Sequence, residues 1–168
     1  AIGCKYTFPN GDIKFTGTLG HIGTTSFYPS KNLGCYGDGG AIFTNDDTLA
    51  EKIKMIVNHG EKIKYHHEII GCNSRLDSIQ AEILNIKLKY LDAYNSNRKI
   101  MAKNYNSALA EIQELVTPKV LDNSEHVYHQ YTLKVLNDKR DSFRSYLSDL
   151  GIPSMIYYPI PIHKQKPY

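Results

Sequence analysis

The sequence predicts an α/β protein, and three patterns indicate this class. Residues 1–44 are rich in Gly, Thr and aromatic side chains, and their short apolar runs lie between glycine clusters, which is typical of strands and turns. Residues 45–59 and 76–112 carry apolar side chains at helical spacing. After Pro118 the spacing changes to the alternation of a half-buried strand. We therefore expect strands first, helices next and a small α+β unit last.

The first part of the chain predicts two strands and one helix. The strands are expected at Thr25–Tyr28 and Ala41–Thr44. The Asn-Asp-Asp run at 45–47 can cap a helix, whose apolar stripe consists of Leu49, Ile53 and Ile56. This helix should end near residues 58–60, where the sequence reads Asn-His-Gly.

The middle of the chain predicts a loop and two further helices. Residues 60–75 show no clean period and are expected to form a loop, and long loops are usually functional or mobile. The second helix should bury one face that consists of Leu76, Ile79, Ile83, Ile86 and Tyr90. The third helix has residues 95–97 as a candidate break, and its apolar face consists of Ile100, Ala108, Leu109 and Ile112.

The last part predicts the small α+β unit. Apolar and polar residues alternate over 131–135, which indicates a strand. A helix should begin near Asp138 and end at Gly151, because Pro153 follows two residues later. Its buried side chains should be Phe143, Leu147 and Leu150. A further strand is expected at Met155–Tyr158.

Composition and charge exclude several classes of partner. The 168 residues include 20 Lys and Arg and 17 Asp and Glu, and the net charge of +3 is spread along the chain, so no cationic face for nucleic acid is expected. No apolar run approaches the roughly 20 residues that span a bilayer, and the N-terminus lacks the pattern of a secretory signal. We therefore expect a cytoplasmic protein that binds neither nucleic acid nor membrane.

Neither the cysteines nor the histidines predict a metal site. His66 and His67 are adjacent, and His126 and His129 precede a predicted strand, where side chains three residues apart point to opposite faces. Neither disulfides nor a cysteine zinc site is expected from an odd number of cysteines without Cys-x-x-Cys spacing, which are Cys4, Cys35 and Cys72.

The densest group of chemically informative residues surrounds Lys31. It lies in the segment Ser26–Gly34, which is too apolar and too rich in turn residues to be an exposed charged helix face. Partial burial would favour the neutral amine, which attacks aldehydes to form an imine. If the chain bends at Pro29, the hydroxyl of Ser26 can approach the same ligand and bind a phosphate. A glycine-rich turn with a surface lysine is the alternative that these residues leave open.

Several segments share their residues and their order with one known family. Ser26–Gly34 is followed by Gly-Asp-Gly-Gly-Ala-Ile-Phe-Thr-Asn at 37–45. Further motifs follow at residues 58–60, 65–68, 71–77, 79–81 and 158–163. Together they resemble the DegT/DnrJ family of nucleotide-sugar aminotransferases, which use pyridoxal 5'-phosphate. The resemblance covers essentially the whole chain.

This resemblance implies part of a fold-type-I aminotransferase. Residues 1–92 would belong to the large cofactor-binding domain with its mixed sheet, and residues 93–168 would supply a connecting long helix and a small C-terminal α+β domain, truncated at its end. In the family, an Asp that pairs with the pyridine nitrogen and a nearby Gln lie just upstream of the segment that residues 1–3 resemble. We therefore expect a piece of a longer protein that has no transaminase activity alone.

The resemblance also implies how the cofactor is held. Lys31 would form the imine with pyridoxal 5'-phosphate and later move a proton between substrate and cofactor, and Ser26 would hold the cofactor phosphate. Family members work as homodimers with shared active sites, in which Asn73 or Arg75 would reach the phosphate bound to the neighbouring subunit. An amide and a guanidinium can both donate to phosphate, so the choice between them stays open.

The resemblance also implies substrate-binding residues, but it leaves two roles open for each of them. Tyr65, His66 and His67 would contact the nucleotide-sugar or order their own loop. His163 would form a polar wall of the substrate pocket or make a structural hydrogen bond. The implied reaction transfers an amino group from L-glutamate to a nucleotide-linked keto-sugar, and the sequence around these motifs is more similar to members that act at sugar carbon 3 than at carbon 4.

Two alternatives to this activity remain within the same fold. The dehydratase branch of the family has lost the cofactor lysine, so Lys31 is an argument against it. A regulatory or sensor protein could retain both Lys31 and Ser26 and bind a ligand without turnover.

Overall fold

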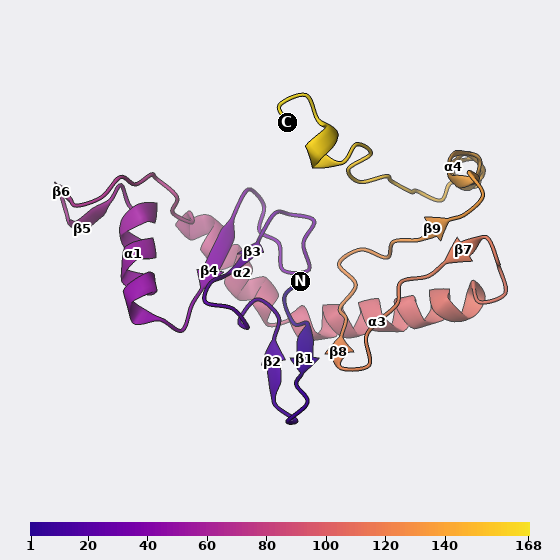
Figure 1. Ribbon diagram of the computed structural model, residues 1–168, viewed down its shortest axis with the longest axis horizontal. Coiled ribbons are helices and arrows are strands. Elements are labelled where there is room, and N and C mark those ends of the chain that lie inside the picture. The colour runs from indigo at the N-terminus through magenta and orange to yellow at the C-terminus, as the bar shows by residue number, and fades with distance from the viewer. The chain divides into compact units, whose positions relative to one another are not determined.

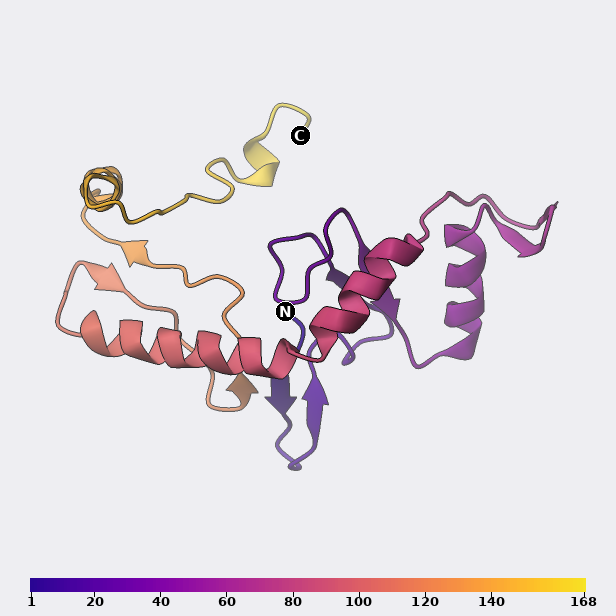
Figure 2. The same cartoon turned by 180° about the vertical axis from the view of Figure 1, so that it is seen from behind.

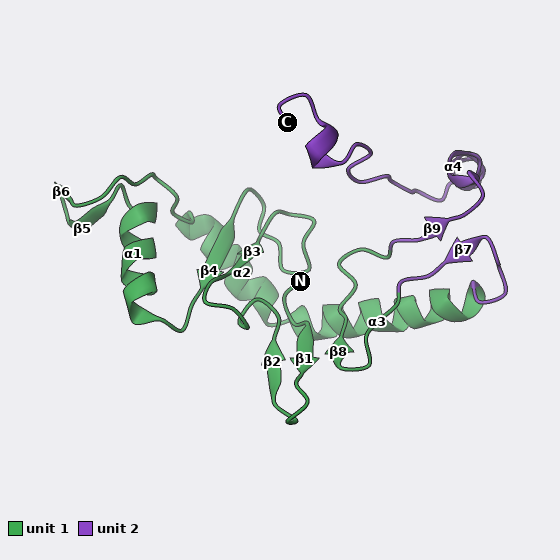
Figure 3. Ribbon diagram, in the orientation of Figure 1, with its two compact units in different colours: residues 1–108, 119–131 green, residues 109–118, 132–168 purple.

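The computed structural model describes residues 1–168 and divides into two compact units (Figure 3). The first unit contains residues 1–108 and 119–131, and the second contains residues 109–118 and 132–168. No helix of either unit is both long and apolar enough to cross a membrane. The expected division of the complete fold between residues 92 and 93 stays a prediction.

The first unit combines three helices with three small antiparallel sheets (Figure 1). Its helices are α1 (Asp47–Val57), α2 (Ser78–Leu88) and α3 (Leu91–Ala108). Its strands are β1 (Lys5–Thr7), β2 (Ile13–Phe15), β3 (Gly23–Ser26), β4 (Gly40–Phe43), β5 (Glu61–Ile63), β6 (His66–His67) and β8 (Ser124–Glu125). The sheets have the orders β2-β1-β8, β3-β4 and β5-β6. This mixture confirms the predicted α/β class.

The two predicted strands of the first part form the β3–β4 hairpin. Gly23 to Ser26 pair with Phe43 to Gly40 in antiparallel register. β3 ends at Ser26, earlier than predicted, because the chain turns there. The hydroxyl of Ser26 accepts a hydrogen bond from Tyr28 N (3.2 Å), and Lys31 N donates to Tyr28 O (2.8 Å), which are the bonds of a turn.

The helix α1 is confirmed with both of its ends. The Oδ1 atom of Asp46 accepts a hydrogen bond from Leu49 N (3.0 Å), which caps the start of the helix. After Val57 the chain leaves the helix through His59 and Gly60, whose φ angles of +60° and +77° lie in the left-handed region. Local capping chemistry therefore sets both ends of this helix.

The predicted loop at 60–75 contains a β-hairpin instead, formed by β5 and β6. Tyr65 turns the chain with φ +68°, and its N–H donates to the carboxylate of Glu61 (3.2 Å). A side chain thus supports a turn that would otherwise need glycine, and no alternation of apolar residues accompanies it. Figures 1 and 2 both show this hairpin beyond α1 and away from the β3–β4 hairpin.

The predicted buried face of α2 is confirmed only in part, since Leu76 and Ile83 are half-buried and the other members are exposed. Ile79 is 75% exposed and Ile86 is 52% exposed, whereas Leu84, outside the predicted stripe, is 7% exposed. Both faces of this helix carry apolar residues, so the sequence alone could not choose between them. Leu84 belongs to the core cluster, which consists of Phe27, Leu33, Cys35, Leu84 and Leu91.

The candidate break in the third helix is also absent, since α3 runs continuously through residues 95–97. Asn95 is 5% exposed, and its side chain bonds to other segments instead of competing for the helix backbone. Ile100, which was expected to be buried, is 57% exposed, and Ala102 is the buried residue on this stretch.

The second unit contains β7 (Leu115–Val116), β9 (Lys134–Val135), α4 (Arg140–Asp149) and the short 3₁₀-helix η1 (Ile162–Lys164). β7 and β9 pair antiparallel, so the strand predicted at 131–135 is present only at its end. The helix α4 and its end at Gly151 (φ +71°) are confirmed, although Leu150 is 57% exposed. The strand predicted at Met155–Tyr158 is not formed, because no neighbouring segment pairs with it.

Candidate functional site

The site begins with a closed loop over residues 27–39, which we call the lysine loop. It connects β3 to β4, and its base is closed by Phe27 N donating to Gly39 O (2.7 Å) and Cys35 N donating to Phe27 O (2.8 Å). The thiol of Cys35 also bonds to Phe27 O and Gly37 O, each at 3.0 Å. These bonds satisfy the backbone inside the loop and fix its two ends together.

Apolar side chains fill the inside of the lysine loop. Phe27, Leu33 and Cys35 are 8%, 6% and 0% exposed, and they pack on Leu84 of α2 and Leu91 of α3. A Cβ at Gly39 would lie 2.9 Å from Leu76 Cδ1 and 3.0 Å from Cys35 Sγ, so a side chain there would require these neighbours to shift. Close packing of this kind gives the loop one defined conformation.

Two polar side chains of α2 hold the part of the loop on either side of Cys35. Gln80 accepts a hydrogen bond from Tyr36 N through Oε1 (2.8 Å). Lys87 donates from Nζ to Gly34 O (2.7 Å), and its ammonium lies 4.6 Å from the centre of the Tyr36 ring. The lysine loop is therefore attached to α2 by polar contacts as well as by its apolar interior.

Lys31 and Ser26 lie on opposite sides of the turn at Pro29, where the chain bends as expected. Lys31 is partly buried and its amine makes no hydrogen bond or ion pair. Ser26 is exposed at the end of β3 and accepts its one hydrogen bond from Tyr28 N, which leaves its own hydroxyl proton available to a ligand. A free amine and a free hydroxyl donor on one rigid turn fit an aldehyde that carries a phosphate.

His129 is a neighbour of Lys31 that the sequence did not indicate. The pKa of His129 lies below its ordinary value because the ring is partly buried, and because the positive charges of Lys31 and Arg98 lie nearby. Its Nδ1 atom is buried without a hydrogen-bond partner. The two residues are far apart in the chain and no local motif links them, so only the fold could bring them together.

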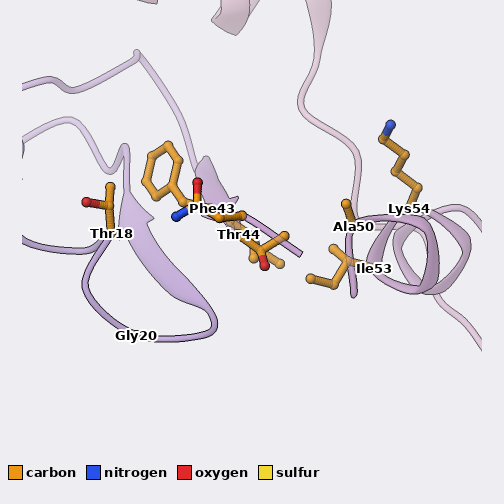
Figure 4. A pocket seen from close by; sticks show the side chains of 9 residues that line it. Thr18, Gly20, Phe43, Thr44, Ala50, Ile53 and Lys54 are labelled. Carbon is orange, nitrogen blue, oxygen red and sulfur yellow. The ribbon is translucent and has the colours of Figure 1, made fainter. Parts of the chain in front are cut away.

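An aromatic hollow of about 430 Å³ also includes His129 and Arg98. Its wall contains four tyrosines, which are Tyr94, Tyr105, Tyr128 and Tyr131. A separate apolar pocket of about 390 Å³ lies between the end of β4 and α1 (Figure 4), and none of the predicted site residues line it. The aromatic hollow is therefore the one that shares a residue with the surroundings of Lys31.

A second group of predicted site residues gathers at the C-terminal end of α1. His59 links them, since its N–H donates to Cys72 O (3.0 Å) and its carbonyl oxygen lies 2.9 Å from His67 Nδ1. The side chains of Tyr65, His66 and His67 are exposed on the β5–β6 hairpin. This hairpin and the segment after Cys72 therefore share one anchoring residue.

Asn73 and Arg75 are exposed but have a fixed backbone. Asn73 forms a bridge with Asn58, and Ser74 N donates to Val57 O (2.9 Å). The Nε atom of Arg75 donates to Asn73 Oδ1 (3.1 Å). This bond leaves both terminal nitrogens of Arg75 and the amide nitrogen of Asn73 free to donate, so the pair can present several donors to one anion.

The remaining candidates lie apart from these groups. His163 is exposed on η1 in the second unit. The three cysteines are free thiols, of which Cys35 is buried, Cys4 is partly buried and Cys72 is exposed. No group of three or more His, Cys, Asp or Glu side chains in residues 1–168 could hold a metal ion.

Relatives of known description match most of the chain. It is 49% identical over 167 residues to the pleiotropic regulatory protein of Geobacillus stearothermophilus, which covers 98% of this chain and 43% of that protein. It is 46% identical over 147 residues to the UDP-2-acetamido-2-deoxy-3-oxo-D-glucuronate aminotransferase of Pseudomonas aeruginosa. This match covers 88% of this chain and 40% of that protein. The chain thus spans less than half the length of either relative.

A solved structure shares the fold. The crystal structure of S. venezuelae DesV in complex with a ketimine intermediate superposes with a TM-score of 0.91 at 40% identity, over 100% of this chain and 43% of that one. The model of the DegT/DnrJ/EryC1/StrS aminotransferase family matches residues 1–168. The chain belongs to the DegT/DnrJ/EryC1/StrS aminotransferase family.

Proposed function

We propose that the complete protein is a pyridoxal 5'-phosphate-dependent aminotransferase that moves an amino group from L-glutamate to carbon 3 of a nucleotide-linked keto-sugar. The observation that supports this most strongly is the lysine loop, which presents the unpaired amine of Lys31 and the hydroxyl of Ser26 on one rigid turn. The P. aeruginosa relative is named as an aminotransferase of a 3-oxo nucleotide-sugar, which supports carbon 3.

The chain's own residues divide the work at the cofactor. Pyridoxal 5'-phosphate, when bound, supplies the aldehyde and the electron sink. Lys31 would hold it through its amine and, once displaced by the substrate amine, would take and return the proton at the substrate carbon. Ser26 would donate its hydroxyl proton to the phosphate. The packed loop would keep both groups in place while the amine changes partners.

The exposed residues at the end of α1 would act across a subunit interface. We infer a homodimer in which Asn73 and Arg75 donate to the phosphate bound by the neighbouring subunit. Tyr65, His66 and His67 would bind the nucleotide-sugar, as would His163 of the second unit. The position of the β5–β6 hairpin beyond α1, away from the β3–β4 hairpin, supports a role outside the subunit's own lysine loop (Figures 1 and 2).

The name of the G. stearothermophilus relative favours a second candidate, a regulatory protein that binds a ligand without turnover. Both candidates need a bound ligand, but only the aminotransferase exchanges amino groups with it. Addition of L-glutamate should therefore change the absorbance of the protein-bound cofactor in the aminotransferase, and addition of the correct keto-sugar should restore it. A regulatory protein would show neither change.

Covalent trapping tests the role of Lys31 directly. We expect that borohydride treatment of the complete protein, loaded with pyridoxal 5'-phosphate, fixes the cofactor on the peptide that contains Lys31, as read by mass spectrometry. Lys31→Ala should lose this adduct and lower turnover by at least about 100-fold, because it removes the group that carries the proton. Lys103→Ala, at an exposed position of α3, is the matched control and should keep both the adduct and the turnover. An adduct that persists in Lys31→Ala would overturn the assignment.

A further inference from the structure

Two buried amides connect the neighbour of Lys31 to α3. Asn32, the next residue in the lysine loop, is 9% exposed, and Asn95 of α3 is 5% exposed. Asn32 Nδ2 donates to Asn95 Oδ1 (2.8 Å) and to Val127 O (3.2 Å). Buried amides are costly unless they are hydrogen-bonded, so this pair restrains the backbone beside Lys31.

Asn95 itself is held from the opposite side. Its Nδ2 atom donates to Ile2 O (3.1 Å), and Ile2 packs against the core cluster. Gly3, with φ +92°, leaves the space that the amide occupies, because a Cβ at this position would collide with Asn95 Nδ2. The amide of Asn95 is thus fixed between the start of the chain and the lysine loop.

The same helix also holds the segment that carries His129. Arg98, one turn after Asn95, donates from one terminal nitrogen to Tyr128 O and His129 O, both at 3.2 Å. Val127, whose carbonyl accepts from Asn32, is 1% exposed. One helix face therefore fixes the backbone next to Lys31 and the backbone of its neighbour His129.

The bonding of Asn32 indicates that the Asn32–Asn95 pair orients the backbone beside Lys31 rather than adding stability to the fold. Asn32 Oδ1 is buried without a partner, which is a cost that an apolar pair of similar size would avoid. What apolar side chains could not supply is a directional bond at a defined length. A lysine amine that reacts with a carbon atom must be oriented towards it. A displacement of the amine by about 1 Å can lower the reaction rate by about 100-fold.

We propose that Asn95 is a positioning residue for Lys31, which acts through Asn32 to aim the amine at the cofactor. This inference rests on the proposed function, in which Lys31 binds pyridoxal 5'-phosphate. Asn95 touches neither Lys31 nor the substrate in this role. Its effect passes through the Asn32 side chain to the backbone that carries the lysine.

The test measures how fast the complete protein, freed of cofactor, captures pyridoxal 5'-phosphate on Lys31. Capture is followed by the cofactor absorbance after mixing and verified by borohydride fixation. We expect Asn95→Ala and Asn32→Ala each to slow capture about 10- to 100-fold and to lower kcat by a similar factor, with KM for L-glutamate changed less than about 3-fold. The double variant should be no slower than the slower single variant, because each substitution already breaks the Asn32–Asn95 bond through which the effect passes.

Asn106→Ala is the matched control. It lies further along α3 and accepts a hydrogen bond from the Tyr131 hydroxyl, so its loss also costs the helix a side-chain bond, but none that leads to Lys31. We expect its capture rate within about 2-fold of the unchanged protein. Urea unfolding of all variants separates lost stability from lost position, and Asn95→Ser replaces Asn95→Ala if the latter does not fold.

The outcomes separate the inference from the function on which it rests. If the unchanged protein forms no adduct on Lys31, the proposed function and this inference both fail. If the unchanged protein forms the adduct and Asn95→Ala captures the cofactor as fast as Asn106→Ala does at equal stability, the inference alone is overturned. Slow capture with additive effects of the two asparagines would also overturn it.

Discussion

The lysine loop and the segment from His59 to Arg75 differ in how the chain supports them. The lysine loop closes on itself, fills its interior with Phe27, Leu33 and Cys35, and is attached to two helices. The segment at the end of α1 has a fixed backbone but exposes Tyr65 and His66 to solvent. The difference indicates that contacts within this chain fix the conformation around Lys31, whereas the side chains of the β5–β6 hairpin stay exposed.

The largest effect should come from the interior that the lysine loop shares with α2. Leu84→Ala in the 168-residue chain should lower the free energy of unfolding by about 2–5 kcal/mol, because it leaves a cavity against Phe27 and Leu91. Ile79→Ala, on the exposed face of the same helix, should change it by less than about 0.5 kcal/mol. Equal losses in urea unfolding would erase the distinction between the two faces.

The next effect concerns Arg75 and Asn73, whose shares in phosphate binding the sequence left open. Arg75→Ala in the complete protein should weaken cofactor binding by about 1.5–3 kcal/mol, the range for hydrogen bonds to charged groups. Asn73→Ala should cost less, near the lower end of this range at about 1.5 kcal/mol, since its amide carries no charge of its own. Titration with pyridoxal 5'-phosphate measures both. A larger loss for Asn73→Ala would make the amide the principal contact.

A smaller effect is expected on the β5–β6 hairpin. His66→Ala should raise KM for the nucleotide-sugar by about 2- to 10-fold, the equivalent of one lost hydrogen bond. Its free energy of unfolding should stay within about 0.5 kcal/mol, because the side chain is exposed. If stability fell while KM stayed constant, His66 would be a residue that orders the hairpin.

The smallest effect is a pH dependence near the lysine loop. The pKa of His129 is lowered by burial and by the charges of Lys31 and Arg98, so the unfolded chain binds the proton first as the pH falls below about 6.5. The contribution of His129 to the free energy of unfolding should therefore be fully present above this pH. It should decrease as the pH falls towards the lower pKa of His129 in the folded state. His129→Gln should reduce the difference between unfolding at pH 7.5 and pH 5.5, and an unchanged difference would contradict the assignment.

Local chemistry explains which parts could be predicted from the sequence. The cap at Asp46 and the left-handed end at Gly60 are signals carried by a few neighbouring residues, so α1 was predicted with both ends. The turn between Ser26 and Lys31 was predicted for the same reason. In α2, apolar residues lie on two faces, so the sequence alone allows either face to be buried. In this chain only the face that carries Leu84 packs into the core cluster.

Contacts between distant segments explain what was missed. The β5–β6 hairpin depends on the carboxylate of Glu61 and the left-handed Tyr65, neither of which produces a strand pattern. The sequence indicates only a candidate break at residues 95–97, because the partners of Asn95, which are Asn32 and Ile2, lie far away in the sequence. The influence of the Lys31 charge on the pKa of His129 likewise links two segments that no motif connects.

The different accessibility of the thiols has a practical consequence. Cys35 is sealed inside the lysine loop, whereas Cys72 is exposed immediately before Asn73. A maleimide fluorophore should therefore label Cys72 in preference to Cys35 while leaving the loop undisturbed. Its emission would then report on any molecule that approaches the end of α1, and would make that encounter visible in real time.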